Sequence, residues 1–280
     1  MTDKYELTNN IKKTLRTFGR TLHQIKALKD FGDVKKGDLG GWIEGYSNLS
    51  QLDNAWVYDD ASVFDHACVF GDAQVRDNAR VFDHAQVLGQ AKVYNYACVY
   101  GYAHVNYAHI IDYARVRGNA QAYGDAYVRD DAEVYGNAQV YDNAQVYGRS
   151  QVCDNANIFG SGQVYGNAKV FGSAYVYDNA KVYGSAWVHG IINIHENDEI
   201  KDDGSYLVFK NTWSSGRDFV YVLSNHRWHV GSFNGTGDEL IKIAYSDSEL
   251  SGKMYELYVH MAEQAVEMQQ QLKEQLEEGK

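Results

Sequence analysis

A six-residue repeat fills the middle of the chain and limits the folds that it can adopt. Twenty-three blocks run from Ala55 to the block that begins at Ala186, with Ala first in 21 of them and Val third in 20. Ala and Val alternate with variable residues, which predicts a short strand with one buried face. A strict period of six does not fit a helix with 3.6 residues per turn. The repeat therefore predicts a coil of short strands.

The last two positions of each block predict tight corners. Asp or Gly comes first, followed by Asn, Asp, His or Ser, as in Asp142-Asn143. These residues tolerate a left-handed backbone or bond their own main chain. With the same inward residues in every block, each corner turns the chain by the same angle, so Val stacks on Val and Ala on Ala.

The pattern resembles the hexapeptide repeat of left-handed parallel β-helices, in which three blocks form one triangular turn. The resemblance implies a left-handed, three-sided coil of about 7.7 turns, with residues 18 apart as vertical neighbours. We expect a mainly β protein with three parts: an N-terminal β cap (1–52), the β-helix (53–190), and a small C-terminal α+β module ending in a helix (191–280).

The N-terminal residues predict a cap for the open end of the coil. The segments 14–18 and 21–28 alternate around Gly19-Arg20, which favours a hairpin. The stretch from Asp30 to Ile43, with Asn48-Leu49-Ser50, resembles the start of hexapeptide proteins of phages and prophages. One uncharacterised enterobacterial family of this kind is classed as transferases by analogy of fold, which is a weak basis for an activity.

The C-terminal residues predict a separate unit. Strands are expected at 206–209, 219–223 and 228–233, a helix at 238–245, and a second helix from about residue 247. Apolar residues in that helix recur at spacings of 4 and 3, which indicates a short coiled-coil seam: Met254, Tyr258, Met261, Ala265, Met268 and Leu272. Such a seam on a three-sided coil favours a homotrimer, and parallel trimers are also the habit of the hexapeptide family.

Composition excludes several classes of protein. The net charge is −11, which argues against a nucleic-acid binder. No apolar run approaches the ~18 residues of a membrane span. The three cysteines share no metal-ligand spacing. We expect a protein of the bacterial cytoplasm with no cofactor and no membrane contact.

One block is a residue short, and polar and aromatic side chains gather around it. Residues 103–107 precede Ala108 with five residues where six are usual. A register defect of this kind marks a candidate ligand site, although a harmless deletion remains the alternative. Aromatic rings there would stack on a base and guanidinium groups would meet phosphates. The candidate ligand-binding residues around the block are Tyr100, Tyr102, His104, Tyr107, His109, Tyr113, Arg115, Arg117 and Arg129, and the C-terminal ones are Arg217, Arg227 and Trp228.

No catalytic residue or metal site is assigned. His104 and His109 invite comparison with the γ-class carbonic anhydrases, but both precede the inward aliphatic residue, so their phase does not match that family's zinc ligands. Hexapeptide acyltransferases carry a catalytic His on a loop that protrudes from the coil, and residues 55–190 contain no such insertion. His66 and His84 are expected to stack at one corner, continued by Tyr102.

The resulting hypothesis is a non-catalytic, trimeric, phage-type binding protein. Its partner would be a small anionic or nucleotide-like ligand, such as a nucleotide-derived host immune signal, or a host protein. The ligand would bind at clefts between subunits or at the C-terminal module. Two alternatives stay open: a hexapeptide-class acyltransferase, and a structural, polymer-forming or DNA-mimicking protein.

Overall fold

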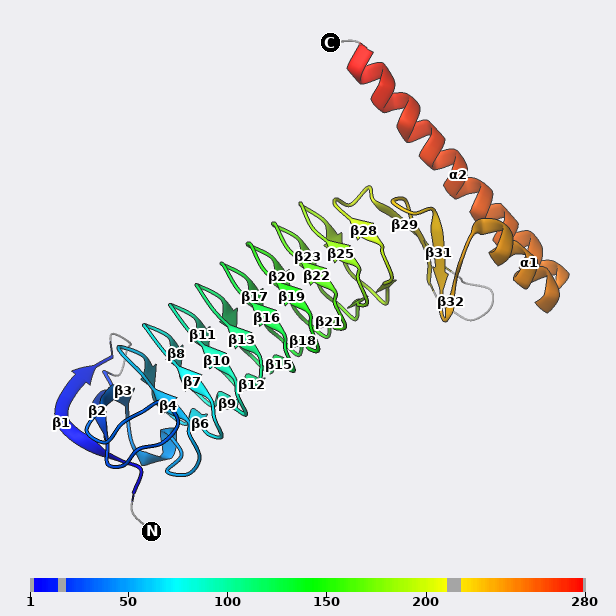
Figure 1. Cartoon of the computed structure of the whole chain (residues 1–280). Coiled ribbons are helices and arrows are strands. Elements are labelled where there is room, and N and C mark those ends of the chain that lie inside the picture. The colour runs from blue at the N-terminus through cyan, green and yellow to red at the C-terminus, as the bar shows by residue number, and fades with distance from the viewer. Residues whose placement is uncertain (1–2, 15–18, 211–217, 279–280) are drawn as a thin grey trace.

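The computed structural model describes residues 3–14, 19–210 and 218–278. Its centre is a β-solenoid of about nine turns (Figure 1). N-terminal strands lie at one end, and a small antiparallel sheet with two helices lies at the other. The protein is mainly β, as the repeat predicts. None of the helices in the described ranges has both the length and the apolar character needed to cross a membrane.

Three parallel sheets form the walls of the solenoid. Wall 1 consists of β3 (Leu39–Ile43), β5 (Ser62–Val63), β8 (Arg80–Val81), β11 (Cys98–Val99), β14 (Arg115–Val116), β17 (Glu133–Val134), β20 (Gln151–Val152), β23 (Lys169–Val170) and β26 (Trp187–Val188). Wall 2 consists of β4 (Trp56–Val57), β7 (Gln74–Val75), β10 (Lys92–Val93), β13 (His109–Ile110), β16 (Tyr127–Val128), β19 (Gln145–Val146), β22 (Gln163–Val164), β25 (Lys181–Val182) and β28 (Glu199–Ile200). Wall 3 consists of β6 (Cys68–Val69), β9 (Gln86–Leu88), β12 (His104–Asn106), β15 (Gln121–Tyr123), β18 (Gln139–Val140), β21 (Asn157–Ile158), β24 (Tyr175–Val176) and β27 (Asn193–Ile194).

The interior is filled by the repeated aliphatic residues. Val134 pairs with Val152 on wall 1, and neither side chain is exposed to solvent. The same stacking recurs along every wall, at a separation of 18 residues, or 17 across the short block, as for Cys98 and Arg115. The prediction that residues 18 apart are vertical neighbours is confirmed.

The corners explain the choice of Asp and Gly. Asp83 has φ +59° and Gly101, one turn above it, has φ +74°. Oδ2 of Asp83 accepts a hydrogen bond of 3.2 Å from the Gly101 amide. Asp130 accepts one of 2.9 Å from Gly148 in the same way. Each Asp side chain thus ties its own corner to the next turn, while Gly supplies the left-handed backbone without strain.

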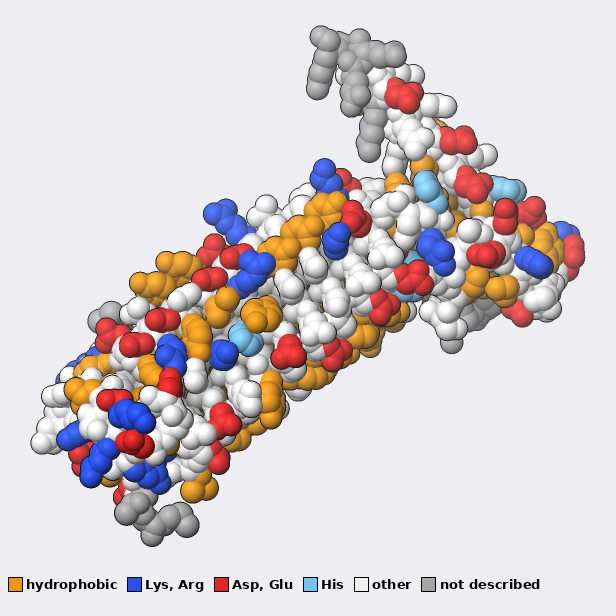
Figure 2. Space-filling model, in the orientation of Figure 1, with side chains coloured by type: hydrophobic (Ala, Val, Ile, Leu, Met, Phe, Trp, Pro, Cys, Tyr) orange, Lys and Arg blue, Asp and Glu red, His pale blue; other side chains and the backbone are white. Residues whose placement is uncertain are grey.

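Outward aromatic residues form rows parallel to the coil. Tyr123, Tyr141, Phe159 and Tyr177 stack with ring centroids 4.7–4.9 Å apart. Figure 2 shows such rows of hydrophobic side chains running along the coil. Stacked rings at this spacing bury apolar area and stabilise the alignment of successive turns.

The coil is longer than the repeat alone indicates. At its start, Trp42 and Ile43 pair in parallel with Ser62 and Val63. At its end, β27 and β28 continue walls 3 and 2 past residue 190. Ile residues and one buried Asp, Asp198, occupy the inward positions there, so the Ala and Val pattern is lost while the geometry persists.

The N-terminal cap is a hairpin of β1 (Tyr5–Lys13) and β2 (Thr21–Ala27), followed by β3 and the short 3-10 helix η1 (Tyr46–Asn48). The first strand lies earlier than expected, and residues 15–18 lie outside the described residues. Lys4 is fully buried at the end of the coil, where its ammonium donates to the carbonyl oxygen of Ala55 at 2.8 Å. Burial lowers the pKa of Lys4 to about 8.

The C-terminal module agrees with its predicted elements except at 228–233, where a turn at residues 231–232 divides the predicted strand into two. Strands β29 (Tyr206–Lys210), β30 (Asp218–Val222), β31 (Arg227–Val230) and β32 (Phe233–Gly235) form an antiparallel meander, followed by α1 (Gly237–Asp247) and α2 (Glu249–Glu278). One face of the sheet, with Val220 and Val222, extends the core of the coil. The other face, with Phe219 and Trp228, packs on the helices.

Candidate functional site

The β1–β2 hairpin folds back over wall 1 and creates two grooves. Leu22 of β2 is only 1% exposed and packs against Phe64 and Phe82, whose rings stack at 5.2 Å. Arg20 fixes the far end of the hairpin through ion pairs of 2.9 Å with Asp65 and 3.1 Å with Glu44. The grooves lie along the two edges of wall 1.

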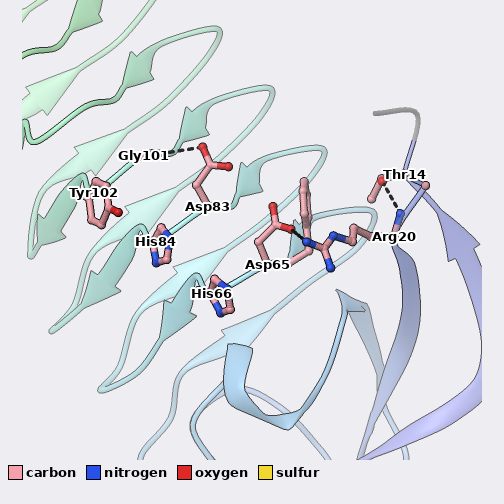
Figure 3. Close-up of a pocket in the computed structure, with 10 residues that line it drawn as sticks. Thr14, Arg20, Asp65, His66, Asp83, His84, Gly101 and Tyr102 are labelled. Carbon is pink, nitrogen blue, oxygen red and sulfur yellow. Dashed lines mark hydrogen bonds and ion pairs between the residues drawn. The ribbon is translucent and has the colours of Figure 1, made fainter. Parts of the chain in front are cut away.

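The first groove, here the His groove, follows the corner after wall 1 and has a volume of about 500 Å³. Figure 3 shows His66, His84 and Tyr102 one above another along this corner, with Arg20 and Thr14 opposite them. The rings stack at 4.8 Å between the two histidines and at 4.7 Å between His84 and Tyr102. The expected stacking of these three residues is present.

The His groove is rich in polar groups that already have partners. Asp65 is paired with Arg20, and Asp83 accepts a hydrogen bond from Gly101 (Figure 3). Among the described residues, the His66 and His84 side chains have no hydrogen bond, and both are exposed. The groove therefore offers ring nitrogens that can donate or accept a hydrogen bond with a polar group.

The second groove, here the basic groove, follows the corner before wall 1 and has a volume of about 250 Å³. Lys12, Lys13 and Arg80 line it, together with Asn78 and Tyr96. Lys12 is 3.7 Å from Asp60, while within the described part of the chain Lys13 and Arg80 form no ion pair. The Tyr96 ring is 53% exposed and stacks on Tyr113 at 5.1 Å.

The structure brings five of the residues predicted from the short block to wall 1 and its corners. They are Tyr100, Tyr102, Tyr113, Arg115 and Arg117. Arg115 and Arg117 share one carboxylate, that of Glu133, at 2.7 and 3.3 Å. Because Glu133 neutralises part of the charge of these two guanidinium groups, only the remainder is available to a ligand.

The remaining four residues of that prediction lie on other walls. His104 and Tyr107 belong to wall 3 and its following corner, and His109 and Arg129 belong to wall 2. The His109 ring stacks on Tyr127 at 4.4 Å, and burial, aided by Lys92, lowers the pKa of His109. The predicted set therefore does not form one cluster.

The short block is accommodated by Gly89 one turn below it. Tyr107 takes the left-handed corner position with φ +65°. A Cβ on Gly89 would come within 2.7 Å of the Tyr107 ring and would also clash with Asn106, so glycine is required there. The defect is absorbed locally, and among the described grooves none is lined by Tyr107.

At the C-terminus, Arg217 lies outside the described residues. Arg227 donates to Asn234 Oδ1 at 2.7 Å, and Trp228 is 1% exposed, so this ring is not available to a ligand. A buried pair that the sequence did not indicate lies beside them: His229 Nε2 is 2.9 Å from Asp198 Oδ2. In the described ranges, no group of three or more His, Cys, Asp or Glu side chains is arranged to hold a metal ion.

Comparison with known proteins identifies the repeat. A family model described as YdcK beta solenoid repeat matches residues 138–154 and 174–190. The coil is a β-solenoid repeat region. A protein of Escherichia coli (strain K12) named "Uncharacterized acetyltransferase YdcK" is 50% identical over 38 residues, which are 14% of this chain and 12% of that protein. The match thus spans a small part of either chain.

Proposed function

We propose that this protein binds a small anionic ligand with a planar ring in the basic groove, without catalysing a reaction on it. The observation that carries the proposal is the convergence of Lys12, Lys13 and Arg80 on one groove of a chain whose net charge is −11. Lys13 and Arg80 have no carboxylate partner in the described ranges, so their charges are available to a ligand.

The magnitude of the attraction favours a phosphate or a similar anion. Two unit charges 4 Å apart attract by about 1 kcal/mol in water and by about 4 kcal/mol near a protein surface. Two or three cations around one groove therefore suffice for measurable binding of a group with charge −2. A carboxylate would gain about half as much.

Tyr96 supports a ring as the second part of the ligand. Its phenol lines the groove, and its orientation is fixed by the stack on Tyr113 at an interplanar angle of 3°. Stacking of a base on an aromatic side chain contributes about 1–3 kcal/mol. The volume of about 250 Å³ is just below the roughly 300–1,000 Å³ of typical small-molecule sites, so the groove would hold only part of a nucleotide.

This site differs from the intersubunit cleft expected from the sequence, but the ligand class is the same. A nucleotide-derived immune signal of a bacterial host belongs to that class. In this proposal, the protein belongs to a phage and sequesters such a signal. It would do so as a homotrimer in the cytoplasm of the host.

Calorimetric titration tests the proposal with four probes: ADP, cyclic AMP, cyclic di-AMP and pyrophosphate. We expect at least one nucleotide to bind with a Kd below about 100 µM. Arg80→Gln should weaken binding at least tenfold, about 1.4 kcal/mol. Arg129→Gln, which removes the same charge from wall 2, is the matched control. Absence of binding by all four probes, or equal loss in both variants, contradicts the proposal.

A second candidate is an acyltransferase that uses the His groove. Two observations favour it: the exposed imidazoles of His66 and His84 in a groove of about 500 Å³, and the name of the Escherichia coli relative. Acetyl-CoA binding with release of free thiol, lost in His84→Gln and retained in Arg80→Gln, would favour this function over the first.

A further inference from the structure

Helix α2 carries an apolar stripe on its solvent side. At 100° per residue, five exposed side chains lie within about 60° of arc. Their exposed fractions are 64% for Leu250, 50% for Leu257, 46% for Met261, 63% for Met268 and 56% for Leu272. The stripe runs nearly the whole length of the helix.

Two other sides of the first half of α2 are already occupied. Val259 and Ala262 are buried against the antiparallel sheet. Tyr258 packs on Phe209 at 5.1 Å and donates to the carbonyl oxygen of Lys210, so it is not part of the stripe, although the predicted seam includes it. Helix α1 lies along a third side, where the Tyr245 hydroxyl donates to Glu256 at 2.8 Å.

The stripe has an 11-residue period. Leu250, Met261 and Leu272 are 11 residues apart, and Met254 and Ala265 each follow four residues after a member of that series. Eleven residues over three turns give 3.67 residues per turn, which produces a straight or slightly right-handed helix pair. The heptad seam expected from sequence would instead wind to the left.

We propose that copies of this chain associate through this stripe of α2. Glutamines border much of it: Gln264 and Gln275 lie within about 50° of its centre and Gln271 at about 70°. Lys253, at the same angle as Gln271, is paired with Glu249 at 3.0 Å, whereas Glu263 and Glu274 lie more than about 100° away. Two identical helices can therefore approach without a row of like charges meeting along the stripe. A basic partner protein is not favoured, because no row of acidic side chains borders the stripe.

The end of α2 has no packing of its own. Beyond Val266 the described side chains of the helix are exposed or, at Gln269 alone, intermediate in exposure. An isolated helix of about 12 residues is marginal in water, so a second copy would supply the missing contacts. A 30-residue helix is about 45 Å long and 10 Å wide, so one helix pair buries about 900 Å² in total. Because stable interfaces exceed about 1,000 Å², the association should depend on concentration in the accessible range.

Sedimentation velocity of the full chain from about 1 µM to about 200 µM tests this assembly. The mass should rise above the 31.6 kDa of one chain as concentration increases. Met261→Glu should weaken association at least tenfold. Gln270→Glu adds the same charge on the opposite side of the helix and should leave association unchanged. Circular dichroism and a thermal melt confirm that both variants keep the fold.

Two results would overturn the inference: the mass of a single chain at every concentration, or association that survives Met261→Glu unchanged. The inference does not rest on the basic groove, which lies at the other end of the coil. Nucleotide titration of Met261→Glu therefore separates the two proposals, because binding in the groove should persist in a chain that no longer associates.

Discussion

Replacing Leu22 by Ala tests whether the β1–β2 hairpin is held over wall 1 by its apolar contact. Leu22 is 1% exposed between the hairpin and the stacked rings of Phe64 and Phe82. The substitution removes three carbon groups at about 0.8 kcal/mol each, or about 2.4 kcal/mol. Since the contact is at the edge of the fold, the gap can partly close, and the cost should stay near 2.5 kcal/mol.

That cost should appear as local opening of the hairpin. At 1.4 kcal/mol for each factor of ten, the open population should rise about 60-fold. Amide hydrogen exchange measures it directly: exchange should accelerate in β1 and β2 and remain unchanged in residues 138–188 of the coil. Leu240→Ala, a buried leucine of α1, is the control and should affect only the C-terminal module.

Binding gives a second measurement on the same variant. The hairpin forms one side of both grooves, so Leu22→Ala should weaken the binding of any ligand in the basic groove while the coil stays folded. Unchanged exchange in β1 and β2 would refute the assignment of Leu22 as the contact that holds the hairpin. Acceleration throughout the coil would refute the independence of the two parts.

Two further predictions concern the ends of the coil. Burial and the neighbouring His229 lower the pKa of His195 below its ordinary value near 6.5. The unfolded chain therefore binds a proton at His195 more readily, so this contribution to the free energy of unfolding is complete above pH 6.5 and falls as the pH decreases. In urea titrations at pH 7.5 and 5.5, His195→Phe should reduce the difference in the free energy of unfolding between the two pH values. A difference identical to that of the unsubstituted chain would contradict this prediction. Gly40→Ala would place a Cβ 2.6 Å from the Trp56 ring and should cost about 1–3 kcal/mol or more in denaturant titration, whereas Gly45→Ala meets nothing within 4 Å and should be neutral; equal costs would refute this packing.

The coil was predictable because every block repeats the same solution. Ala and Val point inward in every turn, and the corner residue of each block, which is Asp or Gly except at Asn95 and Tyr107, adopts a left-handed backbone, so the period specifies most of the packing. The two ends were harder to predict. Asp198 occupies an inward position that is Ala in most blocks, and its partners include His229 and Asn225 from strands and turns about 30 residues later.

The candidate site was predictable only in part. Residues that are neighbours in sequence around the short block lie on three different walls, because each successive block turns onto the next wall. Arg129 and His109 are therefore on a different wall from Arg115 although they are close in sequence. Lys12 and Lys13 line the basic groove together with Arg80, and this arrangement depends on how the hairpin folds back, which no period in the sequence encodes.

A crystal structure measures most directly whether three blocks make one turn around an aliphatic interior. The account predicts Val134 and Val152 on adjacent strands of one wall with both side chains inside, and the rings of His66, His84 and Tyr102 in one stack less than 5 Å apart. Val134 and Val152 on different walls, or facing solvent, would contradict it and would remove both grooves together.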